Sequence, residues 1–95
     1  MSLNGSPYNG QQAVTNTAVA LPAVQFKFVT LKAAAKNNQP LYIGNANVTV
    51  PTGASPGYEL QPGESVPFWV INISSIYVIA ASAGATIEWI GVAGH

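Results

Sequence analysis

The sequence contains no cysteine, no arginine and no aspartate, and only three lysines and three glutamates among its 95 residues. Without cysteine it has neither a disulfide bond nor a thiolate metal site. Charged residues make up 6% of the chain, against about 25% in an ordinary soluble domain. A free monomer normally keeps itself soluble with mixed surface charge, so this deficit favours a protein that is largely covered by partners. A small domain with an uncharged polar surface is the alternative.

The scarcity of charge also argues against nucleic acid and membrane as partners. Binding to phosphates needs clustered Lys or Arg, and the chain offers only Lys27, Lys32 and Lys36. Residues 65–87 carry no charge and are numerous enough to cross a bilayer as a helix. Pro67 and several serines interrupt them, and β-branched and aromatic residues dominate. Two strands joined by a turn are therefore expected in place of a membrane span.

The length suits one domain, and the composition divides the chain into two parts. Residues 1–12 are rich in Gly, Asn, Ser and Gln, with Tyr8 as a possible anchor, and cannot form a core of their own. We expect them to be an N-terminal arm that is flexible or ordered by a partner, and residues 13–95 to be a single β-sandwich domain. The expected fold class is all-β: a small antiparallel β-sandwich or jelly-roll-like barrel with an extended N-terminal arm.

This fold class rests on short β patterns separated by turn signals at a spacing of about 8–12 residues. The expected strands are Val14–Leu21, Val24–Ala33, Leu41–Ile43, Val48–Val50, Val66–Ile71, Ile76–Ala81 and Thr86–Val92. Within the second of them the apolar alternation changes phase, which indicates either a bulge near Phe28 or a strand that passes between two packing partners. Gln61–Glu64, with its Pro-Gly pair, predicts a type II turn. No helix of ordinary length is expected.

The strands that follow Gln61–Glu64 are apolar on both faces. Only one face of a two-layer sandwich should be apolar if the other meets water. Either a third layer or another subunit must then cover the second face, and a chain of 95 residues favours a subunit. The residues that we expect at such an interface are Tyr8, Trp69, Ile71 and Tyr77.

Groups that could catalyse a reaction are few. The carboxylates are Glu59, Glu64 and Glu88, and the one histidine is His95. Glu59 and Glu64 flank a turn and could approach one another as a hydrolase pair, but solvent-facing turn carboxylates are favoured. A serine nucleophile would lack a well-held base, and three or four metal ligands are hard to assemble from this inventory. We therefore expect no enzyme activity, no catalytic residue, no metal and no cofactor.

The aromatic residues remain as a source of specific binding. Trp69 and Trp89 lie among apolar neighbours, and packing in the core is the favoured role for each. Tyr42, Tyr58 and Tyr77 are either core residues or interface anchors. An exposed row of aromatic rings would also suit stacking on sugars, as in carbohydrate-binding modules, and the spacing does not separate these options.

Several segments together resemble small structural proteins encoded among the virion genes of tailed bacteriophages. The segments that carry the resemblance are Leu41–Gly44, Val48–Thr49, Gly57–Ser65, Ile76–Ala80 and Ile87–Ile90. No single motif is diagnostic, but their order and spacing are shared over about residues 14–92.

This resemblance implies a virion protein at the capsid surface, most simply a decoration (cement) protein that binds and stabilises neighbouring major capsid subunits. It also implies a homo-oligomer, with a trimer favoured, and it supplies no catalytic residue. The alternative is a phage tail, neck or fibre component with a host- or carbohydrate-binding role.

Overall fold

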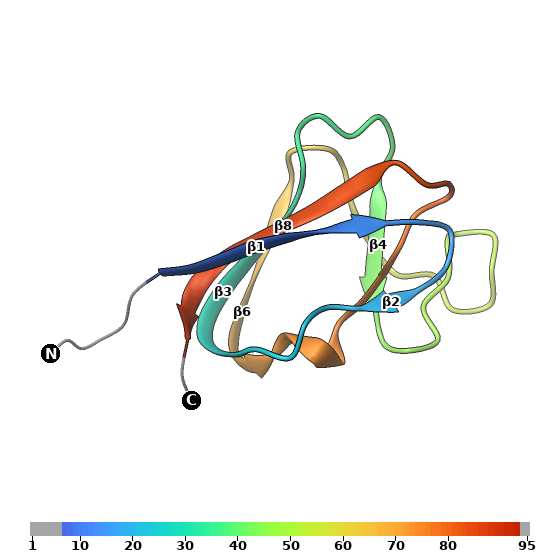
Figure 1. Cartoon of the computed structure of the whole chain (residues 1–95). Helices are drawn as coiled ribbons and strands as arrows, with labels where there is room; N and C mark the ends of the chain where they lie inside the picture. Colours follow the sequence, from blue (N-terminus) through green and yellow to red (C-terminus); the bar gives the residue numbers. More distant parts are fainter. Residues whose placement is uncertain (1–6, 94–95) are drawn as a thin grey trace, which may run out of the picture.

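A computed structural model describes residues 7–93 and shows two antiparallel four-stranded sheets packed against one another (Figure 1). The elements are β1 (Pro7–Val14), β2 (Val19–Ala20), β3 (Gln25–Ala33), β4 (Leu41–Gly44), β5 (Tyr58–Leu60), β6 (Ser65–Asn72), the 3₁₀ turn η1 (Ile73–Ser75), β7 (Tyr77–Ile79) and β8 (Ala85–Ala93). One sheet has the order β1-β8-β3-β6 and is called the long sheet here. The other has the order β2-β7-β4-β5 and is called the short sheet.

The strand pairs are nested along the chain. β1 pairs with β8, β2 with β7, β3 with β6 and β4 with β5, all antiparallel. The chain is thus one long hairpin, with its tip at β4–β5, rolled up into two layers. This is the strand order of a jelly roll. The expected all-β, antiparallel sandwich of jelly-roll type is confirmed.

A bulge in β3 sets the direction of its side chains. Phe26 lies opposite Ala93 of β8, whereas Phe28 lies opposite Val92, so Lys27 is one residue more than β8 can match. The extra residue turns Phe26 inward, where it is fully buried, and leaves Phe28 on the outer surface. Of the two alternatives that the sequence indicated, the bulge near Phe28 is confirmed.

Strand β6 changes phase at the position that faces this bulge. Trp69 lies opposite Phe28 and Ile71 opposite Phe26, so Val70 stands across from Lys27. Val70 has a φ of 50°, in the left-handed region. The two irregular residues therefore sit side by side, and the alternation of both strands shifts together.

The core lies between the two sheets. Its largest fully buried side chains are Val14, Phe26, Val29, Leu31, Leu41, Leu60, Ile73, Val78 and Ile87. Trp89 belongs to the same buried cluster and is 7% exposed, so its expected core position is confirmed. Gly10 lies directly opposite Trp89 in β1, and a Cβ there would come within 2.6 Å of the indole ring. The indole ring of Trp89 therefore fits only because Gly10 has no side chain.

The β4–β5 connection, residues 45–57, forms a third layer over the outer face of the short sheet. Val48 packs there with Tyr42 and Ile79, and Tyr77 lies at the margin of the same cluster. The Thr49 backbone N–H donates to the Ser55 carbonyl at 2.8 Å and folds the loop back on itself. We expected a second subunit to cover apolar strand faces of this kind. On the short sheet that expectation is wrong, because the chain's own loop covers them.

Three other expectations need correction. Residues 7–12, assigned to an arm, belong to β1 and pair with β8; residues 1–6 lie outside the described part of the chain. Val48–Val50 is not a strand, because it contributes a single bridge from Thr49 to Pro56. The expected strand Val14–Leu21 is interrupted, and only Val19–Ala20 of its second half pairs, with β7.

The turn at Gln61–Glu64 has the expected form. Gly63 has a φ of 88°, and the Glu64 N–H donates to the Gln61 carbonyl at 2.8 Å. Such a φ at the third residue of the turn is the mark of a type II turn and is most easily adopted by glycine. The tight connection carries the chain from the short sheet at β5 into the long sheet at β6.

Asn37 continues the hydrogen-bond ladder beyond the end of β3. Its side-chain Nδ2 donates to the Thr86 carbonyl, and its Oδ1 accepts from the Thr86 N–H, both at 2.9 Å. Asn37 is the one polar residue among the buried residues that the structure describes. Its amide therefore stands in for a neighbouring strand where β8 begins.

Replacing Asn37 with alanine is expected to lower the free energy of unfolding by about 1–3 kcal/mol, because the Thr86 N–H loses its acceptor. Urea denaturation followed by tryptophan fluorescence measures the change. Asn38→Ala is the control, since Asn38 is exposed and should cost less than about 0.5 kcal/mol. Equal effects of the two substitutions would contradict the assigned role.

Candidate functional site

The outer face of the long sheet carries its side chains in three cross-strand rows. The first row contains Trp69, Phe28 and Val92, and the second contains Pro67, Thr30, Ile90 and Asn9. The third contains Ser65, Lys32, Glu88 and Gln11. The face is therefore apolar toward the end where β8 finishes and polar toward the other end.

The apolar end forms an exposed group of large side chains, which we call the outer patch. Its members are Phe28 (37% exposed), Trp69 (64%), Val70 (70%) and Ile90 (55%). The rings of Phe28 and Trp69 are in contact, with centroids 5.2 Å apart and planes inclined by 59°. Scattered exposed apolar residues are ordinary on proteins, but two exposed aromatic rings in contact are typical of a binding surface.

Val70 is the most exposed member of the outer patch, and its backbone is strained. A β-branched residue at positive φ is a true outlier, and such a conformation costs about 1–3 kcal/mol. Packing in the core does not offset this cost, because Val70 is 70% exposed. A disfavoured backbone that presents an apolar side chain to solvent is a feature of binding sites.

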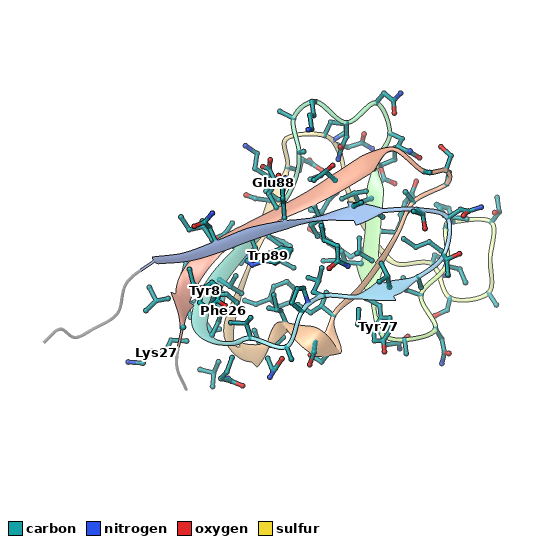
Figure 2. All side chains as sticks on the ribbon, viewed as in Figure 1. Tyr8, Phe26, Lys27, Tyr77, Glu88 and Trp89 are labelled. Carbon is teal, nitrogen blue, oxygen red and sulfur yellow. The ribbon has the colours of Figure 1, made fainter. Side chains whose placement is uncertain are left out.

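Next to the outer patch the same face is hollowed. The hollow has a volume of about 620 Å³, and its polar side chains are Asn9, Gln11, Thr30, Lys32, Ser65 and Glu88. Lys32 and Glu88 are cross-strand neighbours of opposite charge. Figure 2 shows Glu88 and Trp89, consecutive in β8, on opposite sides of the sheet. The hollow is therefore rich in hydrogen-bonding groups, and it borders the outer patch through Ile90, which belongs to both.

A second hollow, of about 450 Å³, lies along the open side of the sandwich, where β6 of the long sheet faces β4 and β5. Its lining is mainly apolar and includes Ile43, Tyr58, Val66, Phe68, Ile71 and Ile76. Tyr58 stands at its rim with 64% of its surface exposed, which matches the exposure of Trp69.

The structure does not bring the four expected interface residues together. Trp69 lies in the outer patch, and its expected place in the core is wrong. Ile71 lines the second hollow, and Tyr77 packs at the margin of the third layer. Tyr8 is half exposed at the start of β1, where its ring meets that of Phe26 edge-on with centroids 5.9 Å apart (Figure 2). Sequence reasoning missed Phe28, Val70 and Ile90, although the phase shift around Phe28 was the available signal.

The carboxylates of Glu59 and Glu64, considered above as a catalytic pair, both accept hydrogen bonds from Gln61 in the turn between them. The Gln61 N–H donates to Glu64 Oε1 at 2.8 Å, and the Gln61 side-chain amide donates to Glu59 Oε2. Both glutamates are exposed. His95 lies outside the described residues.

The phenol of Tyr42 lies in an environment that disfavours its ionised form. Burial raises the pKa of Tyr42 above 10.0, and the negative Glu59, its cross-strand neighbour on β5, raises it further. Tyr42 therefore stays protonated at neutral pH, as a packing residue beneath the third layer.

Within residues 7–93, no three His, Cys, Asp or Glu side chains gather closely enough to hold a metal ion. The helical content of the same residues includes nothing with the length and apolarity needed to traverse a bilayer.

Comparison with known proteins adds no family assignment. No protein-family model and no curated protein sequence matches the chain. Among solved structures, a subunit described under "Bacillus endospore appendages form a novel family of disulfide-linked pili" is similar, with 14% identity and a TM-score of 0.47. The match covers 96% of this chain and 88% of that one.

Replacing Val70 with glycine is expected to raise the free energy of unfolding by about 1 kcal/mol, because glycine adopts positive φ without a steric penalty. The control is Ile90→Gly, at an equally apolar exposed position in the middle of β8, which should lower it by about 1 kcal/mol. Urea denaturation of both variants gives the comparison. If Val70→Gly is destabilised as much as Ile90→Gly, the φ of Val70 is not strained.

Proposed function

We propose that this chain is a non-enzymatic structural protein that binds another protein surface through the outer patch of its long sheet. The exposure of Phe28, Trp69, Val70 and Ile90 is the observation that carries the proposal. Aromatic residues in well-packed contacts dominate binding energy at protein interfaces, and a pair of touching rings offers such an anchor.

The distribution of charge supports the same function. The outer patch contains no charged residue. The charges beside it are Lys32 and Glu88 in the third row and the exposed Lys27, which stands across from Val70. An uncharged centre bordered by polar side chains is the usual arrangement of a protein interface. A partner would bury the apolar centre, and each Å² of apolar surface removed from water contributes about 25 cal/mol.

In its specific form the proposal is a decoration (cement) protein at the capsid surface of a tailed bacteriophage, bound to the major capsid protein. This form rests on the resemblance to small phage virion proteins. Purified particles would contain the chain in hundreds of copies if it covers the head. Tens of copies would indicate a tail, neck or fibre component instead, and absence from particles would contradict a virion role.

Trp69→Ala is expected to weaken binding to particles stripped of this chain by about 30-fold or more, as for the loss of an interface hot spot. Tyr58→Ala is the matched control, because Tyr58 is an equally exposed aromatic residue on the short sheet. Copies bound per particle, at a series of protein concentrations, measure both. Both variants should keep the melting temperature of the parent, since each ring is exposed. Equal binding by Trp69→Ala and the parent would refute the outer patch as the binding surface.

Carbohydrate binding is a second candidate, favoured by the hollow beside the outer patch. Its amide, hydroxyl and charged groups suit sugar hydroxyls, and the exposed Trp69 ring suits stacking on a sugar face. Titration with oligosaccharides from the host cell surface separates the candidates. A change in tryptophan fluorescence that is lost in both Trp69→Ala and Gln11→Ala, but kept in the control Asn38→Ala, would support a glycan site.

A further inference from the structure

Sheet edges are a further kind of surface through which this fold can form specific contacts. An edge strand presents unpaired backbone N–H and C=O groups, and proteins protect such edges with short strands, proline, bulges or charge. The two sheets have four edge strands: β1 and β6 in the long sheet, and β2 and β5 in the short sheet.

Three of these four edges carry such protection. β2 has two residues, and β5 has three, of which one is the charged Glu59. β6 is longer, but it contains Pro67, which has no N–H to donate, and the positive φ of Val70 breaks its regular path. None of the three offers a long, regular row of backbone groups to another strand.

The fourth edge strand, β1, lacks all of these devices. It has eight residues with no charged side chain, and its only proline is the first residue, Pro7. Asn9, Gln11 and Ala13 are exposed, and the outer edge of β1 has no strand partner among the described residues. The first half of β1 also extends past the short sheet, so that layer leaves it uncovered (Figure 1).

We propose that β1 pairs with β1 of a second copy, antiparallel and about a two-fold axis, to join the two long sheets into one eight-stranded sheet. A strand without charge meets its own copy without like-charge repulsion. Directly opposite residues share a face in an antiparallel pair, so the outward amides of Asn9 and Gln11 meet outward residues of the same short stretch. In the register centred on Gly10, Asn9 of one copy lies opposite Gln11 of the other.

The symmetry has a consequence for the outer patch. A two-fold axis that relates antiparallel strands in one sheet runs perpendicular to that sheet, so both outer patches lie on the same side. One pair of chains would present two patches to a single flat partner. The product is a dimer and not the trimer that the phage resemblance implies. In a cyclic trimer each β1 would have to pair with a different edge strand of its neighbour. The other edge strand of the long sheet is β6, where Pro67 has no N–H to donate. This pairing does not depend on what the outer patch binds.

The double variant Asn9→Lys/Gln11→Lys tests the pairing, since in the register centred on Gly10 it sets each lysine of one copy directly opposite a lysine of the other. Sedimentation equilibrium should give twice the 9.8 kDa of one chain for the parent and one chain mass for the variant. Asn9→Glu/Gln11→Glu should also be monomeric. An equimolar mixture of the two variants should regain the dimer mass, because opposite charges then face each other.

Two controls make the result specific. Ser65→Lys adds a charge at the opposite edge of the same sheet and should remain dimeric, and so should Trp69→Ala. Cooperative thermal unfolding and an unchanged circular dichroism spectrum would show that each variant is folded; loss of the dimer alone lowers the melting temperature. The proposal fails if the parent is monomeric at millimolar concentration, if the lysine variant stays dimeric, or if the mixture of folded variants does not re-form the dimer. A dimer that Trp69→Ala dissociates would assign the contact to the outer patch instead.

Discussion

The extra residue Lys27 in β3, with Val70 opposite it in β6, determines which side chains of the long sheet reach the core and which reach solvent. Without the shift, Phe26 and Phe28 would lie on the same face of β3. The strand could then not place one aromatic ring in the core beside Ile73 and another on the outer surface. With it, Phe26 is buried while Phe28 stands next to Trp69 on the surface. The binding surface proposed for this protein is thus a product of the same irregularity that completes its core.

The outer faces of the two sheets differ in whether another part of the chain covers their apolar residues. On the short sheet, residues 45–57 fold back and bury Val48 against Tyr42 and Ile79, so a small chain provides its own third layer. On the long sheet no segment within residues 7–93 covers the outer patch. The touching aromatic rings of Phe28 and Trp69 therefore remain exposed on the outer face of the long sheet. An exposed apolar group of this kind is expected where a partner protein binds.

Much of the fold follows from local sequence. The β patterns, the Pro-Gly turn and the phase shift near Phe28 were sufficient for a jelly-roll-like sandwich with a bulge. β1 was missed because Asn9 to Gln12 have low β propensity, and their strand forms through pairing with β8 and the fit of Gly10 to Trp89. β5 was missed because a strand of three residues is too short to show an alternation of apolar and polar side chains. The outer patch was only partly predicted, since Trp69 and Phe28 become neighbours through cross-strand register, which the sequence does not display.

The central claim is that the outer face of the long sheet is the surface by which this protein joins a larger assembly. Electron cryomicroscopy of the assembled particle, at a resolution that separates the two sheets, tests it most directly. The account predicts density of a neighbouring protein against Phe28, Trp69 and Ile90, with the loop of residues 45–57 directed away from that contact. A map in which the outer face meets solvent while the short sheet holds the contact would contradict it.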